Sequence, residues 1–413
     1  MIAPAATLRR PFLRYWLSGF LADFGDGVRL AALPLLAAEI TRSPAAVGAV
    51  TAVQSLPWLL LGAGLGVVVD RTDRRRLMVA VDIARAVIIA GLAVAILLHA
   101  DGLVLIYLTG FTTGVGSALR KTAQVTCVPR LVDAARLDQA NGRIIAGQIV
   151  GNELAGPAVG GWLFGLAAVL PFAVNAGTLG IAVLLLLTLP SVFQPVPRSA
   201  ADGQARPRGS VRRDLAEGLA WLRRNADIRD VTLATGVISA MDAAWFAVLV
   251  LYVVQILHEV PGAYGALLAV GAIGGVAAGA VGSRLTRRLG TWGSLLLAGL
   301  VMAGTQLVLG LTSDVILAAI MLAASSAAFA VFNIVAVTMR QQRVPDALLG
   351  RVSSLFGTVA GGAEALGALG GGLLATAAGI RAPMVWGAVP IAGVTVLLAW
   401  RHRGRGHDRR QAA

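Results

Sequence analysis

Charged residues are scarce in this chain of 413 residues. Asp, Glu, Lys and Arg together make up 14% of the sequence, whereas hydrophobic residues make up 57%. Soluble domains carry about 25% charged and about 45–50% apolar residues. The deviation has the sign expected of a protein dissolved in lipid and argues against a soluble domain.

Cysteine, histidine and lysine are also rare. Cys127 is the only cysteine, so an intrachain disulfide is impossible. The four histidines are scattered over apparent loops and the tail and form no metal-ligand cluster, so neither a metal nor a cofactor is expected. Lys121, the only lysine, follows Arg120 where a nucleotide-binding P-loop requires glycine. An ATP-driven pump is therefore not expected, and an ion or substrate gradient must supply the energy.

Basic residues exceed acidic ones, and the net charge is +14. The chain has no helix-turn-helix or zinc-finger spacing, so nucleic acid is not an expected partner. The arginines instead concentrate in alternate loops, at 71–76, 130–136, 284–288 and 340–343, and in the tail. This is the pattern of cytoplasmic anchors in a multi-pass protein of the inner (cytoplasmic) membrane. It predicts that both termini are cytoplasmic.

Twelve apolar segments are long enough to cross a bilayer, which takes roughly 20 residues each. They lie at about 12–38, 45–69, 77–99, 103–121, 142–168, 171–190, 229–257, 262–283, 291–312, 315–338, 350–378 and 383–400. The fold class expected is an all-α integral membrane protein with twelve transmembrane helices in two pseudo-symmetric halves.

A long polar stretch divides these segments into two sets of six. The expected organisation is an N-terminal bundle at 1–190, a cytoplasmic linker at 191–228, a C-terminal bundle at 229–400 and a basic cytoplasmic tail at 401–413. The second part of the linker has leucines on one face and arginines around it, which predicts an amphipathic helix on the membrane surface.

The two halves repeat each other. Gly66 and Gly282 follow the second and eighth spans, and the same separation in sequence carries Asp26 onto Asp242. Internal repeats of this kind are typical of secondary transporters.

Two motifs carry a family resemblance. The stretch Gly66-Val-Val-Val-Asp70-Arg71-Thr-Asp73-Arg74-Arg75-Arg76 resembles the loop between the second and third helices of the Major Facilitator Superfamily, with Asp73 where glycine is usual. The stretch from Gly151 to Gly161 resembles the superfamily's antiporter signature, through Gly156, Pro157, Gly160 and Gly161. The chain is most similar to the bacterial exporters that include the enterobactin exporter and macrolide efflux pumps. The resemblance implies alternating access and proton-coupled export.

The resemblance also implies a conformational latch near the inner surface. Its expected members are Gly66, Asp70, Arg71, Arg74, Arg75, Asp82 and Arg85. The alternative is that these arginines only anchor the loop.

Ionisable residues within the spans are candidates for function, because each costs about 2.5–3.5 kcal/mol unless it is paired or hydrated. The candidates for proton coupling are Glu153, Asp26, Asp242 and Glu364, in that order. The candidates for lining a cavity are Asp23, Arg29, Gln54, Gln148, Asn152, Asn175 and Asn333. Structural pairing is the alternative for each, and Asp26 and Arg29 are expected to form an ion pair.

The sequence therefore predicts a secondary transporter, not an enzyme, that exports a drug, siderophore or secondary metabolite by proton antiport. A facilitator or importer with the same fold is the main alternative, and a membrane receptor or enzyme is less favoured. The expected partners are a small-molecule substrate, protons and the lipid bilayer, and the expected state is a monomer.

The predicted topology can be tested by cysteine labelling of intact cells with a membrane-impermeant maleimide. In a Cys127→Ser background, Asp101→Cys should be labelled from outside, whereas Thr72→Cys should be labelled only after the cells are permeabilised. Labelling of Thr72→Cys in intact cells would contradict the assigned orientation.

Overall fold

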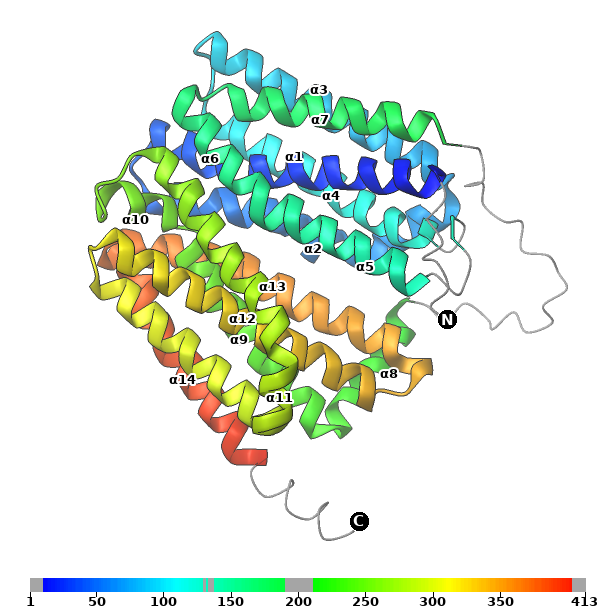
Figure 1. The fold of residues 1–413 in the computed structure, drawn as a ribbon, viewed down its shortest axis with the longest axis vertical. Coiled ribbons are helices and arrows are strands. Elements are labelled where there is room, and N and C mark those ends of the chain that lie inside the picture. Colours follow the sequence, from blue (N-terminus) through cyan, green and yellow to red (C-terminus); the bar gives the residue numbers. More distant parts are fainter. Residues whose placement is uncertain (1–9, 129–130, 133–136, 190–210, 403–413) are drawn as a thin grey trace, which may run out of the picture.

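The computed structural model describes residues 10–128, 131–132, 137–189 and 211–402, and these are almost entirely helical (Figure 1). The first group of helices comprises α1 (Arg10–Ile40), α2 (Pro44–Arg71), α3 (Arg74–Leu97), α4 (Leu103–Cys127), α5 (Leu137–Gln148), the π-helix η3 (Ile149–Ala155), α6 (Gly156–Leu166) and α7 (Leu170–Leu187). The second group comprises α8 (Val211–Arg224), α9 (Ala226–Phe246), α10 (Leu249–Gln255), α11 (Pro261–Leu311), α12 (Val315–Arg343), α13 (Asp346–Ala378) and α14 (Ala382–His402).

These elements correspond to the twelve predicted spans. The segments α5, η3 and α6 form one span, α9 and α10 form another, and α11 contains two spans joined at Gly290, whose φ is 71°. Among the described residues, eight helices are long and apolar enough to cross a membrane, and 44–60 and 262–278 are shorter apolar helices. The two predicted spans that do not meet this criterion are the first, because α1 contains charged residues, and the fifth, because the π-helix interrupts it.

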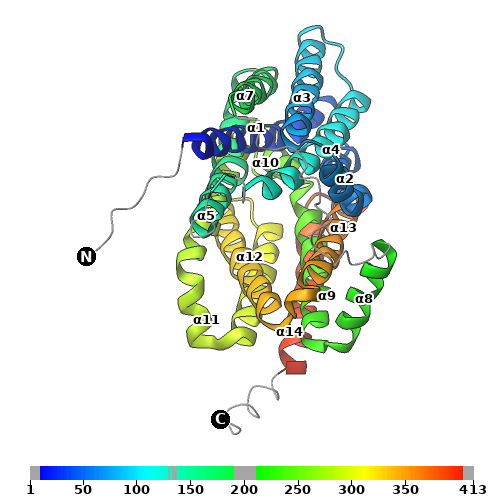
Figure 2. The ribbon, with the colours of Figure 1, turned by 90° about the vertical axis from the view of Figure 1, so that its right-hand side faces the viewer.

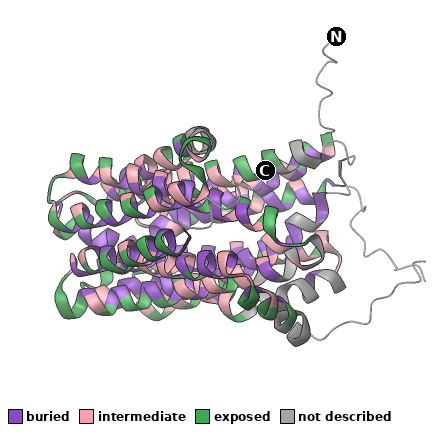
Figure 3. Cartoon of the chain, turned by 90° about the horizontal axis from the view of Figure 1, so that it is seen from below, coloured by how far each residue is buried: buried purple, intermediate pink, exposed green. Residues whose placement is uncertain are grey.

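The outer surface of the bundle is apolar. Val87 on α3, Leu184 on α7 and Val389 on α14 have exposed fractions of 65%, 64% and 69%. Figure 3 shows the buried residues between the helices and the exposed ones toward the periphery. Lipid tails are the natural neighbours of such a surface, since soluble proteins rarely expose large apolar patches.

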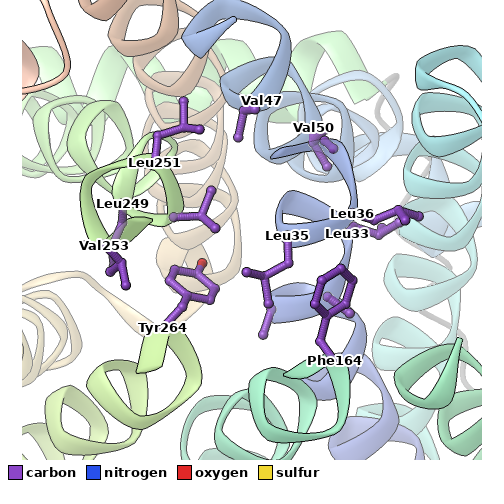
Figure 4. Packing of buried hydrophobic residues seen from close by; sticks show 14 of the residues in the cluster. Leu33, Leu35, Leu36, Val47, Val50, Phe164, Leu249, Leu251, Val253 and Tyr264 are labelled. Atoms are coloured by element: carbon purple, nitrogen blue, oxygen red, sulfur yellow. The ribbon is translucent and has the colours of Figure 1, made fainter. Parts of the chain in front are cut away.

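Among the described residues, the two groups of helices share an apolar core at the end away from the chain termini, and a small cluster of Ala52, Ala243, Ala247 and Ala368 also joins them. Leu35, Leu36 and Phe164 of the first group belong at that end to one buried cluster with Leu251 and Tyr264 of the second (Figure 4). Two other clusters lie toward the end where α1 begins and α14 ends. Each is confined to one group, the first around Phe12, Met78 and Leu186, and the second around Ile228, Met302 and Phe332. The halves are thus sealed against each other at one end, and Figure 2 shows their helices side by side.

Adjacent glycines join α6 to two different helices. A Cβ on Gly160 would lie 2.5 Å from the Val28 carbonyl oxygen of α1, and one on Gly161 would lie 2.6 Å from the Gly265 Cα of α11. Gly160 therefore packs within the first group, whereas Gly161 contacts the second. A side chain at either position would collide with backbone that cannot move aside cheaply.

The same alternation recurs in α13. A Cβ on Gly371 would meet the backbone of Ala244 in α9, within the same group. A Cβ on Gly372 would lie 3.0 Å from the Ala45 Cα in α2, in the other group. Each half thus uses a Gly-Gly pair to hold its own first span and to contact the opposite half.

The sequence predicts a disturbed helix at Gly156-Pro157, and the structure places a π-helix immediately before it. The Gly156 N–H donates to the Gly151 carbonyl, five residues earlier. Proline has no N–H and crowds the preceding turn, so a wider turn accommodates it. π-Helical turns inside α-helices often lie at functional sites.

Several predicted features fall outside the described residues. Gly66, Asp70 and Arg71 belong to α2, but their side chains are not among those described. The first part of the predicted linker is also outside the description, and the division into bundle, linker and tail stays a prediction. α14 continues to His402, beyond the predicted end of the last span.

The glycine packing predicts opposite effects at two positions of α6. Gly160→Ala should lower the free energy of unfolding by about 1–3 kcal/mol, because overpacking forces the backbones apart. Gly165→Ala is the matched control, since a Cβ there would have its nearest neighbour at 3.6 Å. Alanine also favours the helix over glycine, so this variant should be neutral or slightly stabilised. Denaturant unfolding in detergent measures both, and equal effects would contradict the packing.

Candidate functional site

Four buried ionic side chains connect α1, α3 and α4, and we call them the charge network: Asp26, Asp82, Arg85 and Arg120. Arg85 donates to Asp26, and its Nη1 lies 3.4 Å from Asp82. Arg120 Nε donates to both Asp82 oxygens at 2.7 and 2.9 Å. Exposed fractions are 0% for Asp82 and 1% for Arg85. The two carboxylates and two guanidinium groups have equal and opposite formal charge, and the buried Arg29 adds a third guanidinium group 3.7 Å from Asp26.

Neutral side chains complete the network. The Ser117 hydroxyl donates to Asp26 at 2.9 Å, and Arg120 Nη2 donates to the carbonyl and hydroxyl oxygens of Ser18 at 3.1 and 3.0 Å. Arg29 Nη1 donates to Gln54 Oε1 of α2 at 2.5 Å. A buried ion pair is tolerated only when such additional bonds satisfy its remaining donors and acceptors.

The structure groups these residues differently from the sequence prediction. The expected pair of Asp26 and Arg29 is present at 3.7 Å, but Arg85 is the closer partner of Asp26. Asp82 and Arg85 lie buried in the charge network, and their role in the latch stays a prediction. Arg120 was missed as a site residue because the fourth span was predicted to end at 121, while α4 continues to Cys127. Its position within an apolar segment was the available signal.

A second group of charges lies next to the network but outside it. Asn152 Nδ2 of η3 donates to the Asp23 carbonyl at 3.3 Å, which brings the π-helix against α1. Glu153, the next residue of η3, is exposed, and Lys121 of α4 is partly exposed. Lys121 attracts both the Asp23 and Glu153 carboxylates electrostatically. We call Asp23, Lys121 and Glu153 the central triad, and Lys121 is the member that sequence analysis missed.

The carboxylates of the second half lack such cationic partners. Asp242 accepts a hydrogen bond from Trp245 Nε1 at 3.1 Å on its own helix. Glu364 of α13 accepts one from the Ser55 hydroxyl of α2 at 3.4 Å, across the two halves. Neither carboxylate forms an ion pair within the part of the chain that the structure describes, and they repel each other. The predicted coupling candidates therefore lie in three different environments.

The remaining cavity candidates are dispersed. Asn175 is fully buried against Gly25 with an unsatisfied amide, Gln148 is partly exposed, and Asn333 is exposed. A pocket of about 580 Å³ opens at the sealed end, lined in part by Glu39 and Arg42. It contains none of the predicted cavity residues.

The loop after α2 has a defined structural task. The Asp73 carboxylate accepts from the backbone N–H groups of Arg75 and Arg76 at 2.9 and 3.0 Å and caps α3. Aspartate at the position where the superfamily usually has glycine is thus explained by helix capping. Arg75 donates to the carbonyls of Leu186 and Leu187 at the end of α7, where a cation is favourable. The role of Arg74 and Arg75 as a latch stays a prediction.

His402 was assigned to the tail by its sequence position, but the structure buries it at the end of α14. Its Nε2 lies 3.3 Å from Asp230, its Nδ1 lies 3.1 Å from Asp227, and its ring stacks on Trp292 at 4.1 Å. Arg343 of α12 also pairs with Asp227. This cluster ties the ends of α9, α12 and α14 to the middle of α11, just after its kink at Gly290. Among the described residues, no group of His, Cys, Asp and Glu has the arrangement of a metal site.

Solved structures with the same fold are membrane transporters. The nucleoside transporter NupG aligns with 96% of this chain and 99% of its own, at a TM-score of 0.71 and 16% identity. A bacterial homologue of the iron transporter ferroportin, in an inward-facing state, aligns with 95% and 100%, at a TM-score of 0.73 and 17% identity. The fold, with its twelve spans, is that of a Major Facilitator Superfamily transporter.

Sequence comparison assigns the chain within this class. The profile of the transmembrane secretion effector family matches residues 2–409, so the chain belongs to that family. It is 29% identical over 382 residues to the enterobactin exporters of Shigella boydii serotype 18 (strain CDC 3083-94 / BS512) and Escherichia coli O81 (strain ED1a), covering 87% of this chain and 84% of each relative. The protein is therefore a multi-pass membrane transporter and not an enzyme.

The charge network predicts a non-additive effect on stability. Asp82→Asn or Arg120→Gln alone should lower the free energy of unfolding by about 3–5 kcal/mol, because each leaves a buried charge without its partner. The double variant should lose clearly less than the sum of the two. Denaturant unfolding in detergent of the four proteins measures the coupling, and strict additivity would show that the pair contributes no interaction energy.

Proposed function

We propose that this protein exports a small molecule from the cytoplasm by proton antiport, with Glu153 as the residue that exchanges protons. One observation carries the proposal. Glu153 is an exposed carboxylate on a π-helical turn, outside the charge network, and Lys121 attracts it electrostatically. A coupling carboxylate must gain and lose a proton during transport, which a residue locked in a buried ion pair cannot do easily.

The arrangement of the halves supports loading from the side of the termini. The halves share an apolar core at the opposite end, whereas each has its own core near the termini. With the arginine-rich loops and both termini on the cytoplasmic side of the inner membrane, this is an inward-facing state.

The central triad provides a simple exchange. When Glu153 is deprotonated, the two carboxylates outnumber Lys121 and the triad carries one net negative charge, and in this state the site takes up substrate from the cytoplasm. In the outward-facing state, protonation of Glu153 leaves Asp23 and Lys121 balanced, so the triad becomes neutral and the charge that the substrate meets changes by one unit. Because the carboxylate releases its proton only on the cytoplasmic side, protons enter as substrate leaves.

Two other carboxylates are secondary candidates. Glu364 bonds to Ser55 across the sealed end, so its protonation state can affect how strongly the halves hold together there. Asp26 is less suited than the sequence alone indicated, because Arg85 and Ser117 already satisfy it. The names of the relatives favour export of a siderophore-like substrate. The alternative is a facilitator, and the experiment must distinguish it from a proton antiporter.

Flux into proteoliposomes tests the antiport. Labelled enterobactin is the first probe, followed by any compound that raises the melting temperature of the purified protein in a panel. Accumulation in the lumen should require a lumen more acidic than the medium and should stop when an ionophore collapses the gradient. Glu153→Gln should abolish this accumulation but retain exchange of labelled for unlabelled substrate, because exchange needs no net proton transfer.

Asp101→Asn, which removes a carboxylate from the loop between α3 and α4, is the matched control and should transport normally. Flux that ignores the pH gradient in the wild-type protein and in Glu153→Gln would identify a facilitator instead.

A further inference from the structure

Arg340 is a cation with no anionic partner among the residues that the structure describes. It lies near the terminus-side end of α12, and its Cζ is 3.9 Å from the ring centroid of Phe356 on α13. Its Nε and Nη1 atoms are buried, and neither has a hydrogen-bond partner. In the part of the chain that the structure describes, no carboxylate pairs with it.

Other arginines of the spans and their ends differ from it. Arg85 and Arg120 each pair with a carboxylate in the charge network, although Arg85 Nε has no hydrogen-bond partner. Arg343, three residues further along α12, pairs with Asp227. A buried donor that stays unsatisfied costs about 1–3 kcal/mol, and more when the group is charged. The cation–π contact returns only about 0.5–2 kcal/mol. An anion that binds to the unused N–H groups of Arg340 would therefore stabilise the protein.

The location of Arg340 suits a ligand that enters from the termini side. Side chains on a helix lean toward its N-terminus, so the guanidinium group extends from the end of α12 toward the middle of the span. Phe356 lies well inside α13, and both residues are partly exposed. They lie toward the end where the two halves do not share an apolar core. A molecule entering there can reach the guanidinium plane while Phe356 covers its face.

The carboxylates deeper in the same half determine how the ligand is oriented. Asp242 and Glu364 lie farther from this end and have no cationic partners among the described residues, so they repel an anionic group. An anion is therefore stabilised at Arg340 and destabilised beyond it. The apolar remainder of the ligand is free to extend toward the middle of the protein.

We propose that Arg340, supported by Phe356, binds the anionic group of the transported molecule, which is a small organic anion with an apolar body. The assignment rests on the proposed transport function and specifies the class of substrate. The carboxylate, sulfonate or phosphate of such a molecule fits the planar N–H donors of the guanidinium group. The phosphate of an anionic lipid shares this chemistry, and the experiment must distinguish the two sources.

Calorimetric titration of the purified full-length protein in neutral phosphatidylcholine nanodiscs tests the proposal. The probes are 2-naphthalenesulfonate and its uncharged analogue 2-naphthol. Arg340→Gln should weaken binding of the sulfonate about tenfold or more, because a charge-assisted bond is lost, and should leave binding of 2-naphthol unchanged. Phe356→Leu should weaken binding of the sulfonate less than Arg340→Gln does, since the cation remains.

Arg287→Gln is the matched control, because it removes an exposed arginine on the same side of the protein. It should not change the affinity for either probe. Melting temperatures of all variants are measured in parallel, and Arg340→Lys, which keeps the charge, should bind the sulfonate with intermediate affinity. Equal loss in Arg287→Gln and Arg340→Gln, or no sulfonate binding by the wild-type protein, would overturn the proposal.

A second arm separates lipid from substrate. Phosphatidylglycerol is added to the nanodiscs, and lipid retained by the protein is counted by native mass spectrometry. If Arg340→Gln abolishes lipid retention but leaves sulfonate affinity unchanged, Arg340 is a lipid site and the substrate assignment is wrong. Because binding is measured at equilibrium without a gradient, failure of the proton antiport would leave these results intact.

Discussion

The ion pairs between Asp26 and Arg85 and between Asp82 and Arg120 are the constraint on which the first half of the protein depends. Within a bilayer no water is available to solvate a charge, so every buried ion needs a protein partner. Here the partners come from α1, α3 and α4, and the pairs therefore fix how these three spans are rotated against one another. The glycine contacts of Gly156 and Gly160 then bring the fifth span against α1.

The charge network separates charges that hold helices together from charges that are available for transport. Charges that neutralise each other are buried and hold helices in place. Some charges outside it are exposed, such as Glu153, or lack an ionic partner among the described residues, such as Arg340 and Glu364. Only the second kind can respond to a proton or a ligand without breaking the fold. The first half thus acts as a rigid block that carries the central triad, and the second half offers isolated charges.

The sequence was sufficient to predict the membrane spans but not to predict which charged residues form ion pairs. Apolar segments and the arginine-rich loops predicted twelve spans, because both follow from local composition and the membrane. The contact between Asp26 and Arg85 depends on how two helices distant in sequence are rotated, which no local pattern records. Arg120 was missed because a charged residue at an apparent span end is ambiguous. The sequence showed Pro157, but the π-helix before it depends on packing against α1.

If the ion pairs hold α1, α3 and α4 together, the first half moves as one rigid block against the second during transport. Electron–electron distances between spin labels test it directly, with labels at positions 142 and 188 within the first half and at 142 and 287 across the halves, on the side of the termini. Between neutral and acidic pH, the 142–188 distance should stay constant, whereas the 142–287 distribution should gain a shorter component. A change within the first half, with the distance across the halves fixed, would contradict the account.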